Sequence, residues 1–212
     1  MSSRDVVLGR IRAALAADDQ APIPVPREYI RVGANPPGSE PVIELMVDRL
    51  VDYKAHVREV AAAELADAID TALGELSSIV VAADLDPALG QACGRSGRTV
   101  TADGDPVVLT PAELDGIDAV VTTAKVAIAL SGTIVLDAGP GQGRRAITLV
   151  PDFHLIVLHA DQIVQTVPEA IARLDPIRPL TMIAGPSAIS DIELERVEGV
   201  HGPRTLYVLI VR

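Results

Sequence analysis

The sequence SIVVA at residues 78–82 and the sequence AVVTT at residues 119–123 are short apolar runs bounded by polar and turn-forming residues. A continuous apolar run of this length is typical of a strand that is buried on both faces of a parallel sheet. Further strand-like runs occur at 99–101, 133–136, 155–158, 181–183 and 206–211. The chain therefore carries the strands of a sheet with an aliphatic core.

Helical segments alternate with these strands. They are expected at 42–51, 60–73, 87–93, 111–114 and 168–174. Proline occupies the first position of the last three, where its missing N–H and fixed φ favour the start of a helix. Strands that alternate with helices predict an α/β fold with a mostly parallel, doubly wound sheet. In such sheets ligands bind outside the carboxyl ends of the strands, so we expect the functional loops there.

The first 40 residues differ from the rest of the chain. Residues 4–17 place apolar side chains on one stripe and predict an amphipathic helix. The proline run at 21–26 favours extended backbone. We therefore expect an N-terminal helix and proline-rich arm at 1–40, and one α/β domain at 41–212. The arm would lay its helix against a neighbour within the domain or on a second subunit, which is compatible with a homo-oligomer.

Charge and composition argue against nucleic acid as a partner. The formal net charge is −11, so the field of the whole molecule repels phosphate backbones. Aromatic residues make up 2% of the chain, too few for a base-stacking surface.

Cys93 is the only cysteine, which excludes an internal disulfide. It also excludes an iron–sulfur cluster held by this chain alone, because such a cluster typically takes about four thiolates. No apolar stretch reaches the roughly 20 residues of a membrane span, and the first residues lack the apolar run of a signal peptide. We expect a cytoplasmic protein without a membrane span, and the sequence leaves its cofactor unknown.

The first loop of interest, at 137–145, contains Gly139, Gly141 and Gly143, followed by Arg144 and Arg145. Alternate glycines let a backbone approach a ligand closely, and the two arginines add bidentate donors for an anion. The spacing is neither the dinucleotide fingerprint nor a Walker loop. The loop predicts an anion cradle, and the alternative is a flexible connection with two solvated arginines.

The second loop contains Gly185 and Ser187 at the end of a strand-like run. Ser190, with Glu193 three residues later, has the pattern of a capping box and predicts the start of a helix. A helix N-terminus beyond a strand end is suited to a carboxylate or phosphate, although capping alone explains both residues. Ser187 has no G-x-S-x-G surroundings, so a hydrolase triad is poorly supported.

The third loop places His201 between glycines, with Gly202 after it. A histidine there can act as a general acid or base, or its ring can hold the loop through a hydrogen bond. His154 stands before the strand-like run 155–158, where a hydrogen-bonded structural role is the more common one. A metal site from His154, His201, Asp191 and Glu193 lacks any close-set ligand pattern, and we predict none.

Taken in order, these motifs resemble the LUD-domain family, most densely from about Val120 to the C-terminus. The matching motifs are 127–136, 139–145, 149–152, Gly185–Pro186–Ser187, Asp191–Ile192–Glu193 and 199–203. The resemblance implies a fold like the sugar-isomerase and CoA-transferase-like α/β domains. It also implies a role in oxidising L-lactate to pyruvate beside two iron–sulfur partner proteins. The family pattern Ala-Glu-Thr-Gly-Thr has Leu130 in place of its glutamate here, so any step that needs this carboxylate is missing or supplied from elsewhere.

We therefore predict a component of a cytoplasmic lactate-oxidation system that binds a small anionic ligand. The catalytic candidates are His201 and Asp191. The ligand-binding candidates are Thr133, Gly139, Gly141, Gly143, Arg144, Arg145, Gly185, Ser187 and Gly202. The hypothesis requires Gly143, Arg144, Ser187 and His201 to converge in one crevice. Two alternatives remain: a non-catalytic metabolite-binding, nucleotide-binding or assembly module, and a CoA-transferase-like or phosphate-ester enzyme. Whether the chain is an enzyme by itself stays open.

Overall fold

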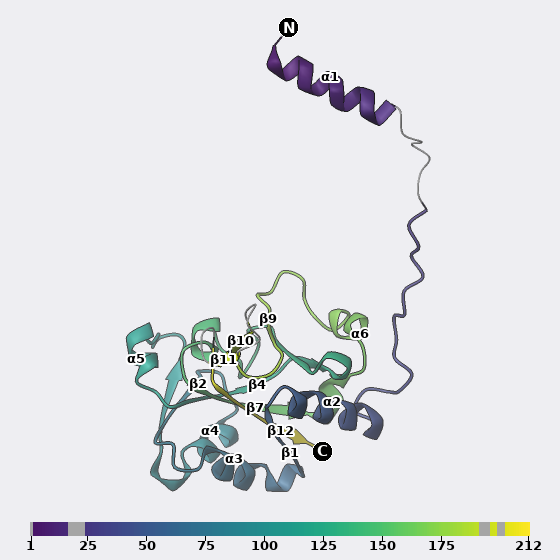
Figure 1. The fold of residues 1–212 in the computed structure, drawn as a ribbon. Coiled ribbons are helices and arrows are strands. Elements are labelled where there is room, and N and C mark those ends of the chain that lie inside the picture. The colour runs from purple at the N-terminus through teal and green to yellow at the C-terminus, as the bar shows by residue number, and fades with distance from the viewer. Residues whose placement is uncertain (1, 17–23, 191–195, 199–201) are drawn as a thin grey trace. The chain divides into compact units, whose positions relative to one another are not determined.

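The computed structural model describes residues 2–16, 24–190, 196–198 and 202–212 (Figure 1). Residues 1–30 and residues 31–212 are separate compact units, and each is described by itself. In the first unit, the predicted helix is present as α1 (Ser3–Ala16), and none of its residues is buried. Part of the proline run, residues 21–23, lies outside the described residues.

The second unit is built on a six-stranded sheet in which every neighbouring pair is parallel. The strand order is β1-β12-β7-β4-β2-β3. The strands are β1 (His56–Val60), β2 (Ser78–Ala82), β3 (Thr99–Asp103), β4 (Ala119–Thr123), β7 (Phe153–His159) and β12 (Thr205–Val211). The predicted α/β fold with a parallel sheet is thereby confirmed.

Both faces of this sheet are covered, because successive strand residues point to opposite sides. On one face, Leu155 and Val157 of β7 join a core cluster with helices α3 (Leu65–Leu73) and α4 (Pro87–Cys93). On the other face, Ile156 and Leu158 join a cluster with helix α2 (Glu40–Asp52) and a second, smaller sheet. Figure 1 shows α3 and α4 together on one side of the sheet.

The second sheet is mixed and has the order β8-β5-β6-β9. Its strands are β5 (Val126–Ile128), β6 (Thr133–Leu136), β8 (Ile163–Val164) and β9 (Thr181–Ile183). Strands β6 and β9 were expected, but they pair antiparallel to each other and not in the main sheet. The short strands β5 and β8 were not predicted, because runs of three and two residues carry too little pattern.

The remaining elements are short. They are α5 (Pro111–Asp115), α6 (Val167–Ile171), β10 (Ala188–Ser190), β11 (Arg196–Glu198) and the 3-10 helices Ala62–Glu64, Arg95–Gly97, Ala129–Ser131, Arg145–Thr148 and Ala160–Gln162. No helix in the described part of the chain is long and apolar enough to cross a lipid bilayer.

Two sequence predictions are wrong. The helix expected at 60–73 starts only after β1, because Val60 ends that strand in register with Val211. Strand β1 has no apolar run by which it could be predicted, because it is an edge strand with mostly exposed side chains. The capping box at Ser190 does not start a helix, because Ser190 belongs to β10, which pairs antiparallel with β11. Tertiary pairing overrides the local capping signal there, and Glu193 lies outside the described residues.

The strand order reverses between β2 and β4. From β2 the chain continues to β3, which lies on one side of β2 in the sheet. The next strand of this sheet along the chain, β4, lies on the other side of β2, and β7 follows beyond it. Such a reversal opens a crevice at the carboxyl ends of the strands. In this protein the glycine loop that precedes the 3-10 helix Arg145–Thr148 reaches this crevice.

Candidate functional site

The glycine loop packs closely on the carboxyl ends of β2 and β4. The N–H of Thr123 donates to the carbonyl of Gly141 at 3.0 Å, and the Thr123 hydroxyl donates to the carbonyl of Pro140 at 2.9 Å. The N–H of Gly141 donates to Asp84 Oδ1 at 3.0 Å, and that of Gly139 to Asp137 Oδ1 at 3.1 Å. These two N–H groups are thus bonded to carboxylates of the protein itself. They are therefore not available to an external anion in this conformation.

Arg144 makes a fork-shaped ion pair with Asp103 at the end of β3. Its Nε donates to Oδ2 and its Nη2 to Oδ1, both at 2.8 Å. Asp103 is only 3% exposed, and its hydrogen bond from Arg144 holds the pKa of its carboxyl below the usual value. The pair lines a cavity of about 420 Å³ with Asp84 and Asp105. The guanidinium that we expected to bind a ligand is therefore neutralised inside the protein.

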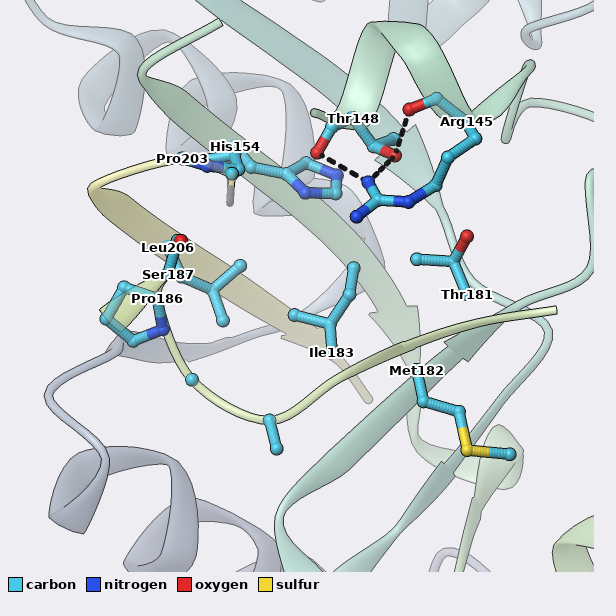
Figure 2. A pocket seen from close by; sticks show the side chains of 13 residues that line it. Arg145, Thr148, His154, Thr181, Met182, Ile183, Pro186, Ser187, Pro203 and Leu206 are labelled. Carbon is cyan, nitrogen blue, oxygen red and sulfur yellow. Dashed lines mark hydrogen bonds between the residues drawn. The ribbon is translucent and has the colours of Figure 1, made fainter. Parts of the chain in front are cut away.

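Arg145, the next residue, faces a different cavity of about 210 Å³ (Figure 2). This pocket lies at the amino ends of β7 and β12, since its walls include His154 and Leu206, the second residue of each strand. The functional loops were expected at the carboxyl ends of the strands, whereas this pocket lies at the opposite end of the sheet. Its polar walls come from Arg145, Thr148, His154, Thr181 and Ser187, and its apolar walls include Met182, Ile183 and Leu206.

The guanidinium of Arg145 is held in place by neutral groups of the described residues. Its Nη1 donates to the carbonyl and to the hydroxyl of Thr148, both at 3.2 Å. In the described part of the chain, no carboxylate forms an ion pair with it. Figure 2 shows its side chain passing between Thr148 and Thr181 toward His154. The pocket thus contains a positive charge that a ligand anion can meet.

His154 forms the buried wall of the pocket. It is 1% exposed, and its Nε2 lies 2.8 Å from the hydroxyl of Thr122. Burial first, and then the charge of Arg145, lowers the pKa of the imidazole to about 3. The ring is therefore neutral near pH 7, with Nε2 engaged by Thr122 and Nδ1 as its second polar atom. The expected hydrogen bond of the ring is present, and this histidine also lines a pocket, which its sequence position did not predict.

The second and third predicted loops meet at this pocket. The N–H of Ser187 donates to the carbonyl of Pro203 at 2.8 Å, and Gly185, Ser187 and Gly202 all line the cavity. Gly185 has a φ of +77°, and a Cβ there would lie 2.7 Å from Cβ of Tyr53. Glycine is thus required where the loop turns against α2. Close packing, together with a left-handed backbone, explains this residue.

The other predicted site residues are not among the described walls of this pocket. His201 and Asp191 are outside the described residues. Thr133 is on β6, where its hydroxyl is 2.9 Å from that of Ser131. Leu130, at the position of the family carboxylate, is 52% exposed and is not among the residues that line the pocket. Its hydrophobic side chain therefore does not alter the pocket directly.

No group of three or more His, Cys, Asp or Glu side chains in the described ranges is arranged to hold a metal ion. Cys93 is buried, and desolvation raises the pKa of its thiol to about 11. The pocket around Arg145 instead offers a cation, three hydroxyl groups and a neutral imidazole. This combination suits a small carboxylate anion, because the fork of an arginine matches a carboxylate. The hydroxyl of Thr148 holds the arginine, since it accepts from Nη1 and donates to the Arg145 carbonyl at 3.1 Å.

Comparison with known proteins matches residues 43–211 to the LUD domain. Lactate utilization protein C of Deinococcus radiodurans is 46% identical over 194 residues, which cover 90% of this chain and 85% of that protein. Lactate utilization protein C of Halalkalibacterium halodurans is 26% identical over 189 residues, 81% of this chain and 80% of that protein. A crystal structure of a DUF162 family protein from Deinococcus radiodurans superposes with a TM-score of 0.68 at 40% identity, covering 81% of this chain and 97% of that one.

Proposed function

Because this chain belongs to the LUD-domain family, we propose that it is a component of an L-lactate utilization system and binds a small carboxylate in the pocket around Arg145. The observation that carries this proposal is the Arg145 guanidinium, which lines the pocket without a carboxylate partner among the described residues. The neighbouring Arg144, by contrast, has such a partner in Asp103.

The charge of the pocket opposes that of the whole chain. The protein carries a formal net charge of −11, yet the described walls of this cavity contain an arginine and no carboxylate. The charge of Arg145 also reaches the buried wall, since it contributes to the lowered pKa of His154. An anion in the pocket would relieve this unbalanced charge, whereas a cation would be repelled.

The size of the pocket favours a small ligand. Its volume of about 210 Å³ is below the roughly 300–1,000 Å³ of sites for drug-sized molecules. L-lactate and pyruvate are small carboxylates of a fitting class, and a nucleotide is too large for this cavity. This difference supports the lactate hypothesis over the nucleotide-binding alternative.

The same proposal includes a cytoplasmic location and iron–sulfur partner proteins. The buried Cys93, with its raised thiol pKa, is a poor ligand for a cluster. Electrons from lactate would then pass through partner chains, with this chain binding the organic acid. We extend the fold assignment to the sugar-isomerase and CoA-transferase-like group from the family resemblance, and no described residue of the pocket favours a CoA-ester chemistry.

The test is calorimetric titration of the purified protein with L-lactate and pyruvate at low salt. We expect binding to the wild type and at least a tenfold weaker affinity for Arg145→Met, because a fork-shaped, charge-assisted contact is lost. Arg145→Lys keeps the charge and should lose less affinity. Arg58→Met, which removes an exposed arginine from β1, is the matched control and should bind like the wild type.

Equal affinities for the wild type and Arg145→Met would contradict the proposed site. A reconstituted system that oxidises lactate at full rate without this chain would contradict the proposed role. The two experiments therefore separate the ligand site from the place of the protein in the system.

A further inference from the structure

A second, smaller cavity adjoins the pocket around Arg145. It has a volume of about 140 Å³ and shares Arg145, Thr148 and Thr181 with that pocket. The residues that line it but not the first pocket are Leu136, Ala138, Gln142, Gly143, Arg144 and Pro179. The two cavities therefore lie on either side of three common residues, one with polar walls and one with mainly apolar walls.

Arg145 lies at the junction of the two cavities and is fixed there. Its Nη1 is held by the carbonyl and hydroxyl of Thr148 at 3.2 Å, and Thr181 stands on the other side of its side chain (Figure 2). A carboxylate bound to this guanidinium would have the rest of the ligand at the boundary. Polar substituents are matched by His154 and Ser187, whereas carbon chains are matched by the apolar cavity.

The apolar cavity has firm walls. Arg178 donates from Nε to the carbonyl of Asp137 at 2.8 Å and from Nη2 to that of Ala138 at 2.7 Å. Ala138 has a φ of +52°, a left-handed conformation that is uncommon for a residue with a Cβ. Arg178 thus ties this part of the glycine loop to the segment that contains Pro179, which forms the facing wall.

We propose that the apolar cavity is a subsite for the aliphatic chain of the ligand, and that the protein binds 2-hydroxy or 2-oxo carboxylates with chains longer than that of lactate. The carboxylate would contact Arg145, the oxygen at C2 would face His154 and Ser187, and the chain would enter the cavity beside Leu136 and Ala138. This inference rests on the proposed function, since it takes the carboxylate at Arg145 as its starting point.

The test is a calorimetric series with glycolate, L-lactate, L-2-hydroxybutyrate and L-2-hydroxyvalerate on the full chain. Burial of each added methylene should tighten binding about threefold to fourfold. Ala138→Leu, which fills the subsite, should remove this dependence on chain length, so that L-lactate and the longer acids all bind with about the affinity of glycolate. Pro179→Leu serves the same purpose should Ala138→Leu fail to give a folded protein by circular dichroism.

The outcomes distinguish this inference from the proposed function. L-lactate binding that depends on Arg145, with equal or weaker binding of the longer acids, overturns the subsite and leaves the proposed function intact. An unchanged chain-length dependence in a folded filling variant also overturns the subsite. Binding of no acid in the series overturns both proposals.

Discussion

Arg144 and Arg145 are neighbours in the sequence and both line the smaller cavity, but their guanidinium groups bond in two different regions of the molecule. Arg144 pairs through two 2.8 Å hydrogen bonds with the almost buried Asp103, at the carboxyl ends of β2 and β3. Arg145 faces a pocket at the amino ends of β7 and β12 and has no carboxylate partner in the described residues. The difference between them is made by a residue 41 positions earlier in the chain.

The role of each arginine is decided by its bonding partner and not by the residue type. A buried carboxylate without a cation is very costly, so the first arginine is needed for the fold. Within the described ranges, the second is bonded to neutral groups only, which leaves its charge to a ligand. If this division holds, changes at the two positions will affect different properties.

The largest expected effect comes from Arg144→Met. This change leaves the carboxylate of Asp103 unpaired at 3% exposure, and we expect the free energy of unfolding to fall by about 3 kcal/mol. Arg145→Met removes no such pair and should lower it by less than about 0.5 kcal/mol. Urea denaturation at pH 7 measures both, and equal losses in the two variants would break the comparison.

The pH dependence sharpens this prediction. The pKa of Asp103 is lowered in the folded protein, so its pairing contributes stability at neutral pH that is lost as the pH falls through the lowered value. The gap in unfolding free energy between the wild type and Arg144→Met should therefore narrow in acid. Asp103→Asn, combined with Arg144→Met in a double-mutant cycle, isolates the pair.

The second prediction compares a glycine from each region. Gly185→Ala would place a Cβ 2.7 Å from Cβ of Tyr53 at a φ of +77°, and we expect the free energy of unfolding to fall by about 2 kcal/mol. Because the same loop lines the pocket, lactate binding should also weaken. Gly141→Ala has a similar φ of +72°, but its Cβ would lie 3.0–3.1 Å from side-chain atoms of Thr123 and Leu85, a less severe contact than the 2.7 Å at Gly185. It should cost about 1 kcal/mol and leave binding unchanged.

Calorimetry on both variants, after urea denaturation has shown the folded fraction, checks this pair. If Gly141→Ala weakened binding and Gly185→Ala did not, the ligand would bind at the glycine loop and not in the pocket around Arg145. That result would also return the glycine loop to the role that the sequence suggested for it.

Much of the fold could be predicted because strong local patterns agreed with the tertiary structure. The apolar runs at 78–82 and 119–123 are the strands β2 and β4, and the helix expected at 87–93 is α4. Strand β1 escaped because its position at the sheet edge exposes its side chains and removes the apolar run. Edge strands and strands of two or three residues carry little information in their own sequence.

The site residues predicted from the sequence come together only where two of its glycine-containing motifs lie side by side in the structure. Gly143, Arg144, Ser187 and His201 were expected to converge, but Ser187 lines the pocket around Arg145 whereas Gly143 and Arg144 line other cavities, and His201 lies outside the described residues. The candidates Gly185 and Gly202 do line the same pocket as Ser187. The choice between Arg144 and Arg145 could not be made from the sequence, because it depends on Asp103, which the strand order brings close. The contribution of His154 to the pocket likewise depends on tertiary structure. Its sequence neighbours, Pro151–Asp152–Phe153, indicate only that a strand begins there.

The third prediction concerns His154 and acid. Its folded pKa of about 3 lies below the ordinary 6.5, so between these values the unfolded chain binds a proton that the folded protein does not. The free energy of unfolding should therefore fall as the pH drops below 6.5, by about 1.4 kcal/mol at pH 5.5 from this group. His154→Gln should remove this part of the dependence. Urea denaturation of both proteins between pH 5 and 8 measures it, and parallel curves would show that the ring titrates normally in the folded state.

The smallest effect is expected from Leu130→Glu, which restores the carboxylate of the family pattern. Leu130 is 52% exposed, and it does not line the pocket around Arg145. An exposed substitution away from buried groups typically changes the free energy of unfolding by less than about 0.5 kcal/mol, and a solvated charge is screened by salt. We therefore expect the affinity for L-lactate to change by less than about twofold in the calorimetric titration, with Arg145→Met as the positive control. A tenfold change would mean that the ligand site extends to the 3-10 helix Ala129–Ser131, and the division between one structural and one binding arginine would then be incomplete.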